Sequence, residues 1–337
     1  MNPPSSLRRI DFHTHVVPRV LEHFAPPAPS WPELVLATPA CGYLARNGTA
    51  IRALDDRSWD VARRIADMDA AGVDVQVLSP LPATFAYDFA PGDTQRFARL
   101  QNDAIAEIVR ERPGRFAGLG TLALQDVDLA CAELERVVCE LGLAGVLIGT
   151  NAAGRELNDP AFASLWERCN ALGVVVFVHP ESAPGFARYA APRLAFAVAY
   201  PNETGATAAA LIMAGFTTRY PRVRWVFAHG GGSLPWNLPR LDAVWSAFPD
   251  MHAVLDEAPS HHARDFHYDT LTFDAQNLRL LVERAGANRL LAGSDYPYVL
   301  MDDPPGSLID GCAALATAAE RAAVHGGNAE RLLARAS

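Results

Sequence analysis

The feature that most restricts the fold of this chain is a repeated alternation of short apolar runs with longer segments of helical periodicity. Eight apolar runs occur, at residues 8–15, 73–79, 115–123, 144–149, 174–180, 223–231, 266–270 and 289–297. Helical segments lie between them, for example at 59–71, 93–110, 127–141 and 160–172, and several begin at Asp or Pro, which favour helix N-termini. This alternation is typical of βα units with parallel strands. Eight units predict an α/β fold, a closed (β/α)8 TIM barrel formed by residues 1–337 as a single domain.

Residues 16–58 do not fit the alternation. They begin proline-rich, with APPAPSWP, and continue with CGYLARNGTAIRAL, in which Asn47-Gly48 is a strong two-residue hairpin signal. We therefore expect a small β insertion after the first barrel strand, over the end of the barrel where active sites are built. With this turn Tyr43 lies opposite Arg52. Arg52 then either points into the site or is a solvated strand residue, and the pattern favours neither reading.

Composition narrows the partners and the compartment. The net charge is −9 and the arginines are spread along the chain, so we expect no nucleic-acid partner. No apolar run approaches the roughly 20 residues that span a bilayer, and the first residues lack the apolar core of a signal peptide. We expect no membrane association and a cytoplasmic location. The five cysteines are scattered and form no C-x-x-C pair, which predicts reduced, mostly buried thiols instead of disulfides or a structural zinc site.

Polar side chains that suit a metal ion stand at the ends of four of the eight runs. His13 and His15 end the first run, His179 the fifth, His229 the sixth, and Asp295 the eighth. The carboxyl ends of parallel barrel strands converge on one rim, so these residues can meet there. Side chains two apart in a strand face the same side, which lets His13 and His15 serve one ion. Imidazoles with a carboxylate and an open position are typical of a catalytic zinc site or a similar divalent one.

A histidine that ends a strand is, taken alone, more often a hydrogen-bonding residue than a ligand. Three strand ends with histidine, together with the aspartate of GSDYP, are harder to explain by coincidence. The remaining histidines lie in loop or helix segments and are His23, His252, His261, His262, His267 and His325. The stretch HHARDFH, residues 261–267, precedes the seventh run and faces away from the proposed site, so it is interpreted as solvated surface.

The motifs DFHTH, HP at 179, FAHGGGSLPW from 227 and GSDYP from 293 resemble the amidohydrolase superfamily, in particular its aminocarboxymuconate-semialdehyde decarboxylase family. The similarity spans nearly the whole chain. It implies a (β/α)8 barrel with one divalent metal ion, usually Zn²⁺ with Mn²⁺ or Co²⁺ as alternatives. The resemblance assigns the following residues: metal ligands His13, His15, His179 and Asp295; acid–base residue His229; carboxylate-binding arginines Arg52 and Arg240. Arg240 is expected to reach the neighbouring subunit's site, which implies a homodimer.

The basic residues support a single metal ion. All 29 of them are arginine, since the chain contains no lysine. Binuclear members of the superfamily bridge two ions with a carboxylated lysine on the fourth strand, and here that run ends in VLIGTN. The absence of lysine also excludes a Schiff-base mechanism and a phosphate-binding P-loop.

The resemblance implies non-oxidative decarboxylation of a small unsaturated or aromatic carboxylic acid. In this reading, metal-bound water and His229 handle the proton, Asp295 is a ligand and proton relay, and the arginines hold carboxylates. Glu181 and Arg193 introduce charges where the family carries a different loop, so the substrate is left open between carboxymuconate-semialdehyde-like and hydroxybenzoate-like acids. The alternatives are a metal-dependent hydrolase or hydratase of a small anionic substrate, and a metal-binding barrel without catalysis.

Overall fold

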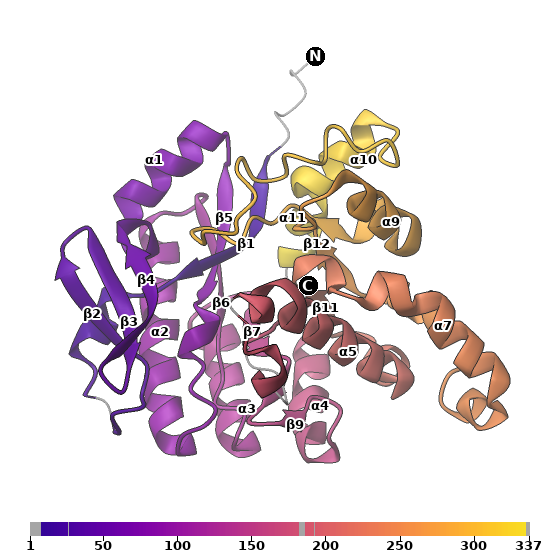
Figure 1. Ribbon diagram of the computed structural model, residues 1–337, viewed down its shortest axis with the longest axis horizontal. Coiled ribbons are helices and arrows are strands. Elements are labelled where there is room, and N and C mark those ends of the chain that lie inside the picture. Colours follow the sequence, from indigo (N-terminus) through magenta and orange to yellow (C-terminus); the bar gives the residue numbers. More distant parts are fainter. Residues whose placement is uncertain (1–7, 26, 182–185, 192, 335–337) are drawn as a thin grey trace.

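The computed structural model describes residues 8–25, 27–181, 186–191 and 193–334, and it confirms the predicted barrel (Figure 1). One sheet of eight strands has the order β1-β5-β6-β7-β10-β11-β12-β13. Each strand coincides with one of the eight predicted runs. The strands are β1 (Ile10–Val16), β5 (Val75–Pro80), β6 (Phe116–Gly120), β7 (Gly145–Gly149), β10 (Val175–His179), β11 (Arg224–Phe227), β12 (His267–Asp269) and β13 (Leu290–Leu291).

The first and last strands meet and close the ring. The Phe12 amide donates to the Ala292 carbonyl at 2.8 Å, and the His15 amide donates to the Tyr296 carbonyl at 2.8 Å. The buried Asp11 carboxylate accepts hydrogen bonds from the Ser294 amide and hydroxyl, at 3.0 and 2.6 Å. Burial raises the pKa of Asp11 to about 7, although the Ser294 hydrogen bonds act in the opposite direction. These contacts attach the segment after β13 to β1.

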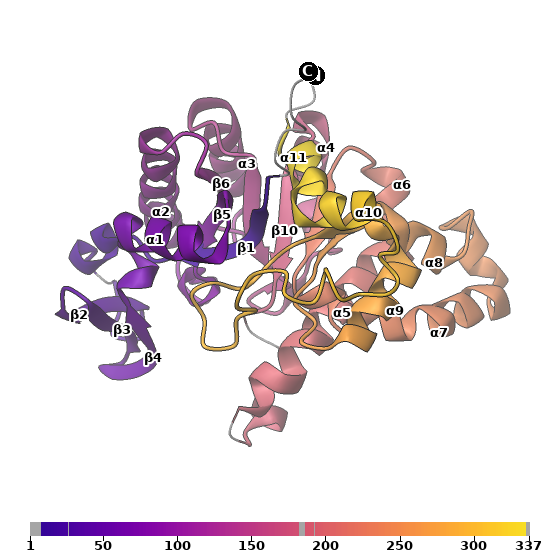
Figure 2. The same ribbon diagram turned by 90° about the horizontal axis from the view of Figure 1, so that it is seen from above.

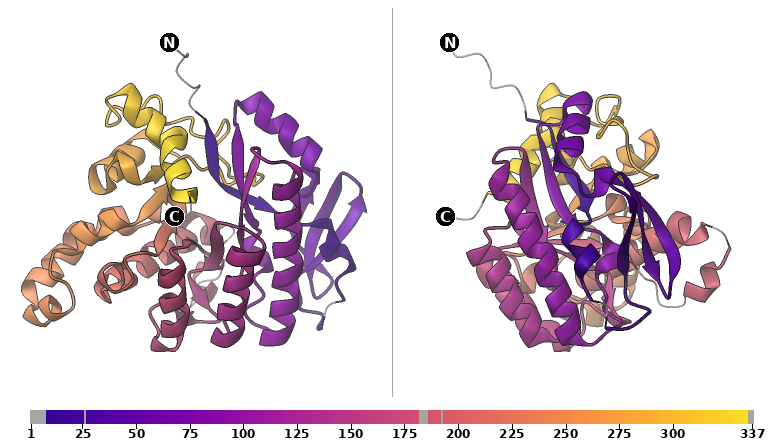
Figure 3. Two further views of the ribbon diagram at one scale, coloured as in Figure 1. Left: turned by 180° about the vertical axis from the view of Figure 1, so that it is seen from behind. Right: turned by 90° about the vertical axis from the view of Figure 1, so that its left-hand side faces the viewer.

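Helices surround the sheet, and α2, α3 and α4 stand side by side on its outside (Figure 3). Aspartates begin three of the helices as expected, because Asp60, Asp126 and Asp274 each accept hydrogen bonds from first-turn amides. The longer helices are α1 (Val61–Ala71), α2 (Pro91–Glu111), α3 (Val127–Glu135), α4 (Ala163–Leu172), α5 (Tyr200–Met213), α7 (Leu234–Ala247) and α9 (Ala275–Ala285). The shorter ones are α6 (Phe216–Arg219), α8 (Pro259–His262), α10 (Ala318–Ala322) and α11 (Asn328–Leu333).

A second, antiparallel sheet follows β1, as the sequence predicts. It has the order β2-β3-β4, with β2 (Glu33–Thr38), β3 (Cys41–Arg46) and β4 (Thr49–Asp55). This sheet and helix α7 lie on opposite sides of the molecule (Figure 2). Asn47 and Gly48 have positive φ angles of 52° and 69°, which the two-residue turn requires. Buried apolar side chains of the segment, including Trp31 and Leu44, pack with Phe97 of α2 and so attach the sheet to the barrel.

The predicted register of the β3–β4 hairpin is wrong by one residue. Arg52 pairs with Leu44, and Tyr43 pairs with Ala53, whereas the sequence placed Tyr43 opposite Arg52. Ala50 still pairs with Ala45, so Ile51 is an extra residue in β4. Such a bulge shifts all later pairs and breaks the simple alternation of faces on which the prediction depended.

Two further expectations about burial are wrong. His262 was expected on a solvated surface, but only 5% of it is exposed, because Thr217 packs against it and the two side chains are hydrogen-bonded at 2.9 Å. The five cysteines are free thiols, as expected, but only Cys169 and Cys312 are buried. None of the helices in the described part of the chain has the length and apolar character of a membrane span.

Candidate metal centre and active site

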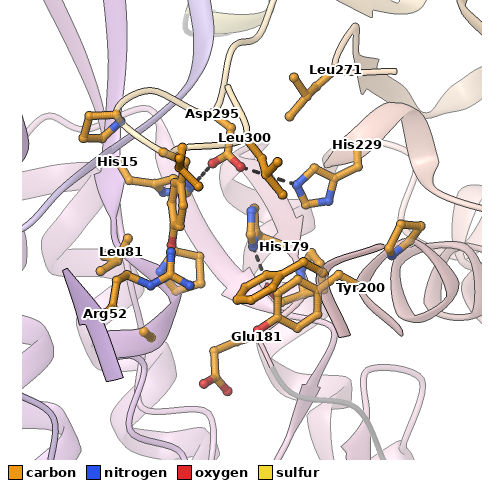
Figure 4. A pocket seen from close by; sticks show the side chains of 18 of the residues that line it. His15, Arg52, Leu81, His179, Glu181, Tyr200, His229, Leu271, Asp295 and Leu300 are labelled. Carbon is orange, nitrogen blue, oxygen red and sulfur yellow. Dashed lines mark hydrogen bonds and ion pairs between the residues drawn. The ribbon is translucent and has the colours of Figure 1, made fainter. Parts of the chain in front are cut away.

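The structure brings all five residues of the predicted constellation together at the carboxyl ends of the strands. Figure 4 shows four of them, His15, His179, His229 and Asp295. His15 Nε2 lies 3.1 Å from His13 Nε2 and 3.0 Å from Asp295 Oδ1. The rings of His13 and His179 have centroids 5.0 Å apart, and those of His179 and His229 are 4.9 Å apart. His229 Nε2 lies 3.8 Å from Asp295 Oδ2. These groups form a single cluster because all eight strands point the same way.

One grouping of possible ligand atoms differs in one member from the predicted set. Among the described residues, one ligand atom each of His13, His179, His229 and Asp295 lies within 4.8 Å of the others. The sequence reserved His229 for proton transfer and placed His15 among the ligands. His15 Nε2 is nevertheless as close to Asp295 as hydrogen-bonded atoms are. The cluster therefore offers five donors, one more than a four-coordinate site needs.

Hydrogen bonds on the far side of three imidazoles turn their Nε2 atoms toward the cluster. The Nδ1 atom of His13 contacts Asp269 Oδ2 at 2.6 Å, that of His15 contacts the Pro80 carbonyl at 3.1 Å, and that of His179 contacts the Pro180 carbonyl at 2.7 Å. Since these partners are acceptors, each Nδ1 carries the proton and Nε2 keeps its lone pair. This is the tautomer that a metal ligand requires.

Unpaired buried atoms test whether the cluster fits a cation. His179 Nε2 is buried and has no hydrogen-bond partner among the described residues, and the same holds for His229 Nδ1 and Asp295 Oδ1. Burying a polar atom without a partner costs about 1–3 kcal/mol. Imidazole nitrogens and a carboxylate oxygen are donors that Zn²⁺ and similar divalent ions prefer. The donor set therefore fits a divalent metal ion.

The cluster also favours the protonation states that bind metal. Burial lowers the pKa of His15 to about 4 and that of His179 well below its ordinary value. Burial alone would raise the pKa of Asp295, but His13, His15 and His229 around it lower that pKa well below its usual range. The neutral imidazoles of His15 and His179 beside an ionised carboxylate are ready to coordinate a cation without first losing protons. His13 differs, because burial alone would lower its pKa, but Asp295 and Asp269 raise that pKa above its ordinary value.

Two members of the cluster have a strained backbone. His229 has a φ of 56° and Asp295 a φ of 67°, in the left-handed region that residues other than glycine rarely adopt. Such conformations cost about 1–3 kcal/mol each and persist where the surroundings impose them. The Asp295 amide is held by the His13 carbonyl at 2.8 Å, and the His229 amide by Asp269 at 2.8 Å. Strain of this kind gathers at functional sites.

Asp269 is a site residue that the sequence analysis missed. It ends β12, is fully buried, and contacts His13 on one side and the backbone of His229 on the other. A signal was present, because the seventh run, FHYDT, carries an aspartate near its carboxyl end, as the eighth run does in GSDYP.

The cluster opens into a cavity of about 1460 Å³. Arg52 enters this cavity from β4, as Figure 4 shows. Its guanidinium carbon lies 4.2 Å from the centre of the Tyr298 ring, and that ring meets His15 edge-on at 5.5 Å between centroids. Of the two readings of Arg52, the structure supports the one in which it points into the site. Tyr200, Glu181 and Arg193 also line the cavity.

Arg240 is the one predicted site residue that this chain brings neither to the cluster nor to its own cavity. It is exposed on α7 and is absent from the cavity lining, whereas Trp236 of the same helix lines the cavity and is 80% exposed. The predicted contact of Arg240 with a neighbouring subunit's site stays a prediction.

Comparisons with known proteins agree with this geometry. The family model described as amidohydrolase matches residues 10–335. The chain is 35% identical over 315 residues to 2-amino-3-carboxymuconate-6-semialdehyde decarboxylase of Dictyostelium discoideum, covering 90% of this chain and 85% of the relative. It is 29% identical to gamma-resorcylate decarboxylase of a Polaromonas species, covering 71% and 78%. The crystal structure of 5-carboxyvanillate decarboxylase from Sphingomonas paucimobilis superposes with a TM-score of 0.80 at 28% identity, covering 98% and 100% of the two chains.

Proposed function

We propose, from the premise that this chain belongs to the amidohydrolase family, that it is a metal-dependent decarboxylase of a small unsaturated or aromatic carboxylic acid. One observation carries this proposal: the cluster of imidazoles and Asp295 lies in a cavity that also contains the arginine of β4. A cation site and a carboxylate-binding group thus face the same space. The relatives named above decarboxylate acids of this kind.

The residues proposed to hold one divalent ion are His13, His15, His179 and Asp295, with Zn²⁺ as the first choice and Mn²⁺ or Co²⁺ as alternatives. When bound, such an ion supplies a Lewis acid that withdraws electrons from an oxygen ligand and lowers the pKa of coordinated water. The unpaired Nε2 atom of His179 and Oδ1 atom of Asp295 support this assignment over a purely structural role for the cluster.

His229 is proposed to move the proton. It lies at the edge of the cluster, with 15% of its side chain exposed toward the cavity. Its proton goes to the substrate carbon that bears the carboxylate, where a C–H bond forms and interrupts conjugation. The bond from that carbon to the carboxylate then breaks, CO2 leaves, and the bonding electron pair restores the conjugated system. Asp295, whose Oδ2 atom lies 3.8 Å from His229 Nε2, is ionised between turnovers; it can take a proton from solvent and pass it to His229 after that ring has given its own proton to the substrate.

Arg52 is proposed to hold a substrate carboxylate. Its stacking on Tyr298 fixes the guanidinium plane and leaves its N–H groups available for a bidentate contact.

Replacing Arg52 with methionine should raise KM by roughly 10- to 100-fold with a smaller change in kcat, because a hydrogen bond to a charged group contributes about 1.5–3 kcal/mol. Steady-state kinetics on the best acid substrate measures this. Arg46→Met is the matched control, since Arg46 lies on the same small sheet and pairs with the exposed Asp88 at 3.0 Å. An unchanged KM in the Arg52 variant would show that Arg52 does not bind substrate.

We also propose that the protein is a homodimer and that it is located in the cytoplasm. A homodimer would place the exposed Arg240 of one copy near the cavity of the other, and its helix already contributes Trp236 to the cavity mouth. A cytoplasmic location agrees with five free thiols.

The first experiment is elemental analysis of the purified protein, followed by an assay of the same sample for CO2 release from carboxymuconate-type and hydroxybenzoate-type acids. We expect about one divalent ion per chain and CO2 release from at least one acid. A bound ion without CO2 from any acid would favour a hydrolase or a hydratase, which products that have gained the mass of water would identify. Protein that binds no divalent ion would contradict the proposed site.

A further inference from the structure

We propose that Asp269 is a positioning residue whose single carboxylate fixes both the metal ligand His13 and the proton donor His229. The inference rests on the proposed function for the roles of those two histidines. Asp269 is not one of the predicted ligands, and it contacts the cluster through His13 and His229.

The contacts of Asp269 use both of its oxygens. Oδ2 accepts from His13 Nδ1 at 2.6 Å and from the His229 amide at 2.8 Å. Oδ1 accepts from the Gly230 amide at 2.8 Å and from the Leu271 amide at 3.1 Å. A carboxylate has about four acceptor positions, so none is left over. The side chain is fully buried, and water cannot replace these bonds.

The contact with His13 decides which ring nitrogen faces the cluster. With its proton held on Nδ1, His13 presents the Nε2 lone pair, which lies 3.1 Å from His15 Nε2 and 3.4 Å from Asp295 Oδ1. Gly293 packs closely against both residues of the pair. A Cβ added at Gly293 would lie 2.8 Å from the His13 Cβ and 2.9 Å from the Asp269 Cβ.

The contact with the backbone after β11 decides where the His229 ring lies. His229 has a positive φ of 56°, and its amide and that of Gly230 both donate to Asp269. Without these two hydrogen bonds the left-handed backbone conformation of His229 is less stabilised, and the turn can relax to a negative φ. Since the same Oδ2 atom bonds His13, the spacing of the two rings, 5.5 Å between centroids, depends on one side chain.

The decisive variant is Asp269→Asn, which keeps the size of the side chain but replaces one acceptor oxygen with a donor NH2. If the NH2 group takes the position of Oδ2, this group faces the His229 amide, which is also a donor. The NH2 group then donates to His13 Nδ1, so that the proton of the His13 ring moves to Nε2. With the NH2 group at the Oδ1 position, it faces the Gly230 and Leu271 amides. We expect metal affinity to fall about 10- to 100-fold, the usual cost of losing an outer-shell partner. We also expect kcat at saturating metal to fall at least about 10-fold with KM unchanged.

Metal affinity is measured by competition with a chelator. The values of kcat and KM are measured by steady-state kinetics at saturating Zn²⁺ with the best acid substrate. Asp274→Asn is the matched control, because Asp274 only caps α9 and asparagine caps helices equally well. Wild-type metal affinity or wild-type kcat in Asp269→Asn would each overturn the proposal, which requires both to fall.

Thermal unfolding of the metal-free proteins shows whether Asp269→Asn is folded. If it is not, Asp269→Glu is tested in the same way, since it keeps both oxygens but pushes the His229 turn away from His13. Wild-type kcat in that variant would overturn the proposal. If the wild type releases no CO2 from any acid, the proposed function has failed, and the affinity comparison still decides whether Asp269 positions His13.

Discussion

Replacing His229 with alanine should lower kcat by about 10²- to 10⁴-fold while the protein keeps its metal ion, because a positioned acid–base group contributes a factor of this size. The ring is placed for this role at the edge of the cluster, where it lies 3.8 Å from Asp295 and lines the cavity. The remaining donors, including His15, are sufficient to hold an ion without it. Metal content by elemental analysis and turnover by CO2 release, measured on one sample, test both halves of this expectation.

The metal content of the His229 variant distinguishes two possible roles of His229, as a proton donor and as a metal ligand. His229 belongs to the group of ligand atoms within 4.8 Å of one another, so a direct role as a ligand is the competing interpretation. Under that interpretation the variant loses metal and activity together. His261→Ala serves as the control, because His261 is exposed and pairs with Glu257 at 2.6 Å outside the site. A His229 variant with normal turnover would remove it from the mechanism.

Replacing His179 with alanine should abolish both metal binding and turnover. Its Nε2 atom is buried without a partner, and the bond from Nδ1 to the Pro180 carbonyl leaves that atom no other orientation. We expect metal affinity to fall by more than about 100-fold, since the loss of even an outer-shell partner costs about 10- to 100-fold. Chelator competition and CO2 release measure the two losses.

The effect of metal on the stability of the His179 variant tests the role of His179 as a ligand independently of turnover. Wild-type protein at 100 times its metal Kd should gain about 2.7 kcal/mol in free energy of unfolding, and the variant should gain almost none. Without metal, the two proteins should unfold at similar temperatures, because the variant also removes an unpaired buried nitrogen. His325→Ala is the control for loss of a buried histidine: it breaks a 2.9 Å bond to Asp310 and should lower the melting temperature but leave metal binding intact. A full response of His179→Ala to metal would exclude His179 as a ligand.

The barrel and the cluster were predictable because one rule covers both. Parallel strands in a closed ring bring their carboxyl ends together, so residues as far apart as His13 and Asp295 meet without any further information. The features that could not be predicted depend on local deviations from regular geometry. The bulge at Ile51 changed the partner of Arg52, and no residue pattern marks it.

Other misses come from contacts between distant segments. His262 is buried because Thr217 of α6 packs against it, which the local polarity of HHARDFH does not reveal. Asp269 escaped notice for a different reason. Its side chain contacts other site residues instead of a ligand, whereas the strand-end pattern predicts side chains that face a ligand directly.

The closure of the ring by β1 and the segment after β13 has a consequence for how the enzyme matures. His13 and His15 are synthesised before the other members of the cluster, whereas Asp295 follows the last of the eight barrel strands. Contacts of such long sequence separation form late, because the intervening chain must first be ordered. The nascent protein therefore passes most of its synthesis with an incomplete set of donors. We therefore expect metal uptake to follow barrel closure, so that bound metal would report that the last strand is in place.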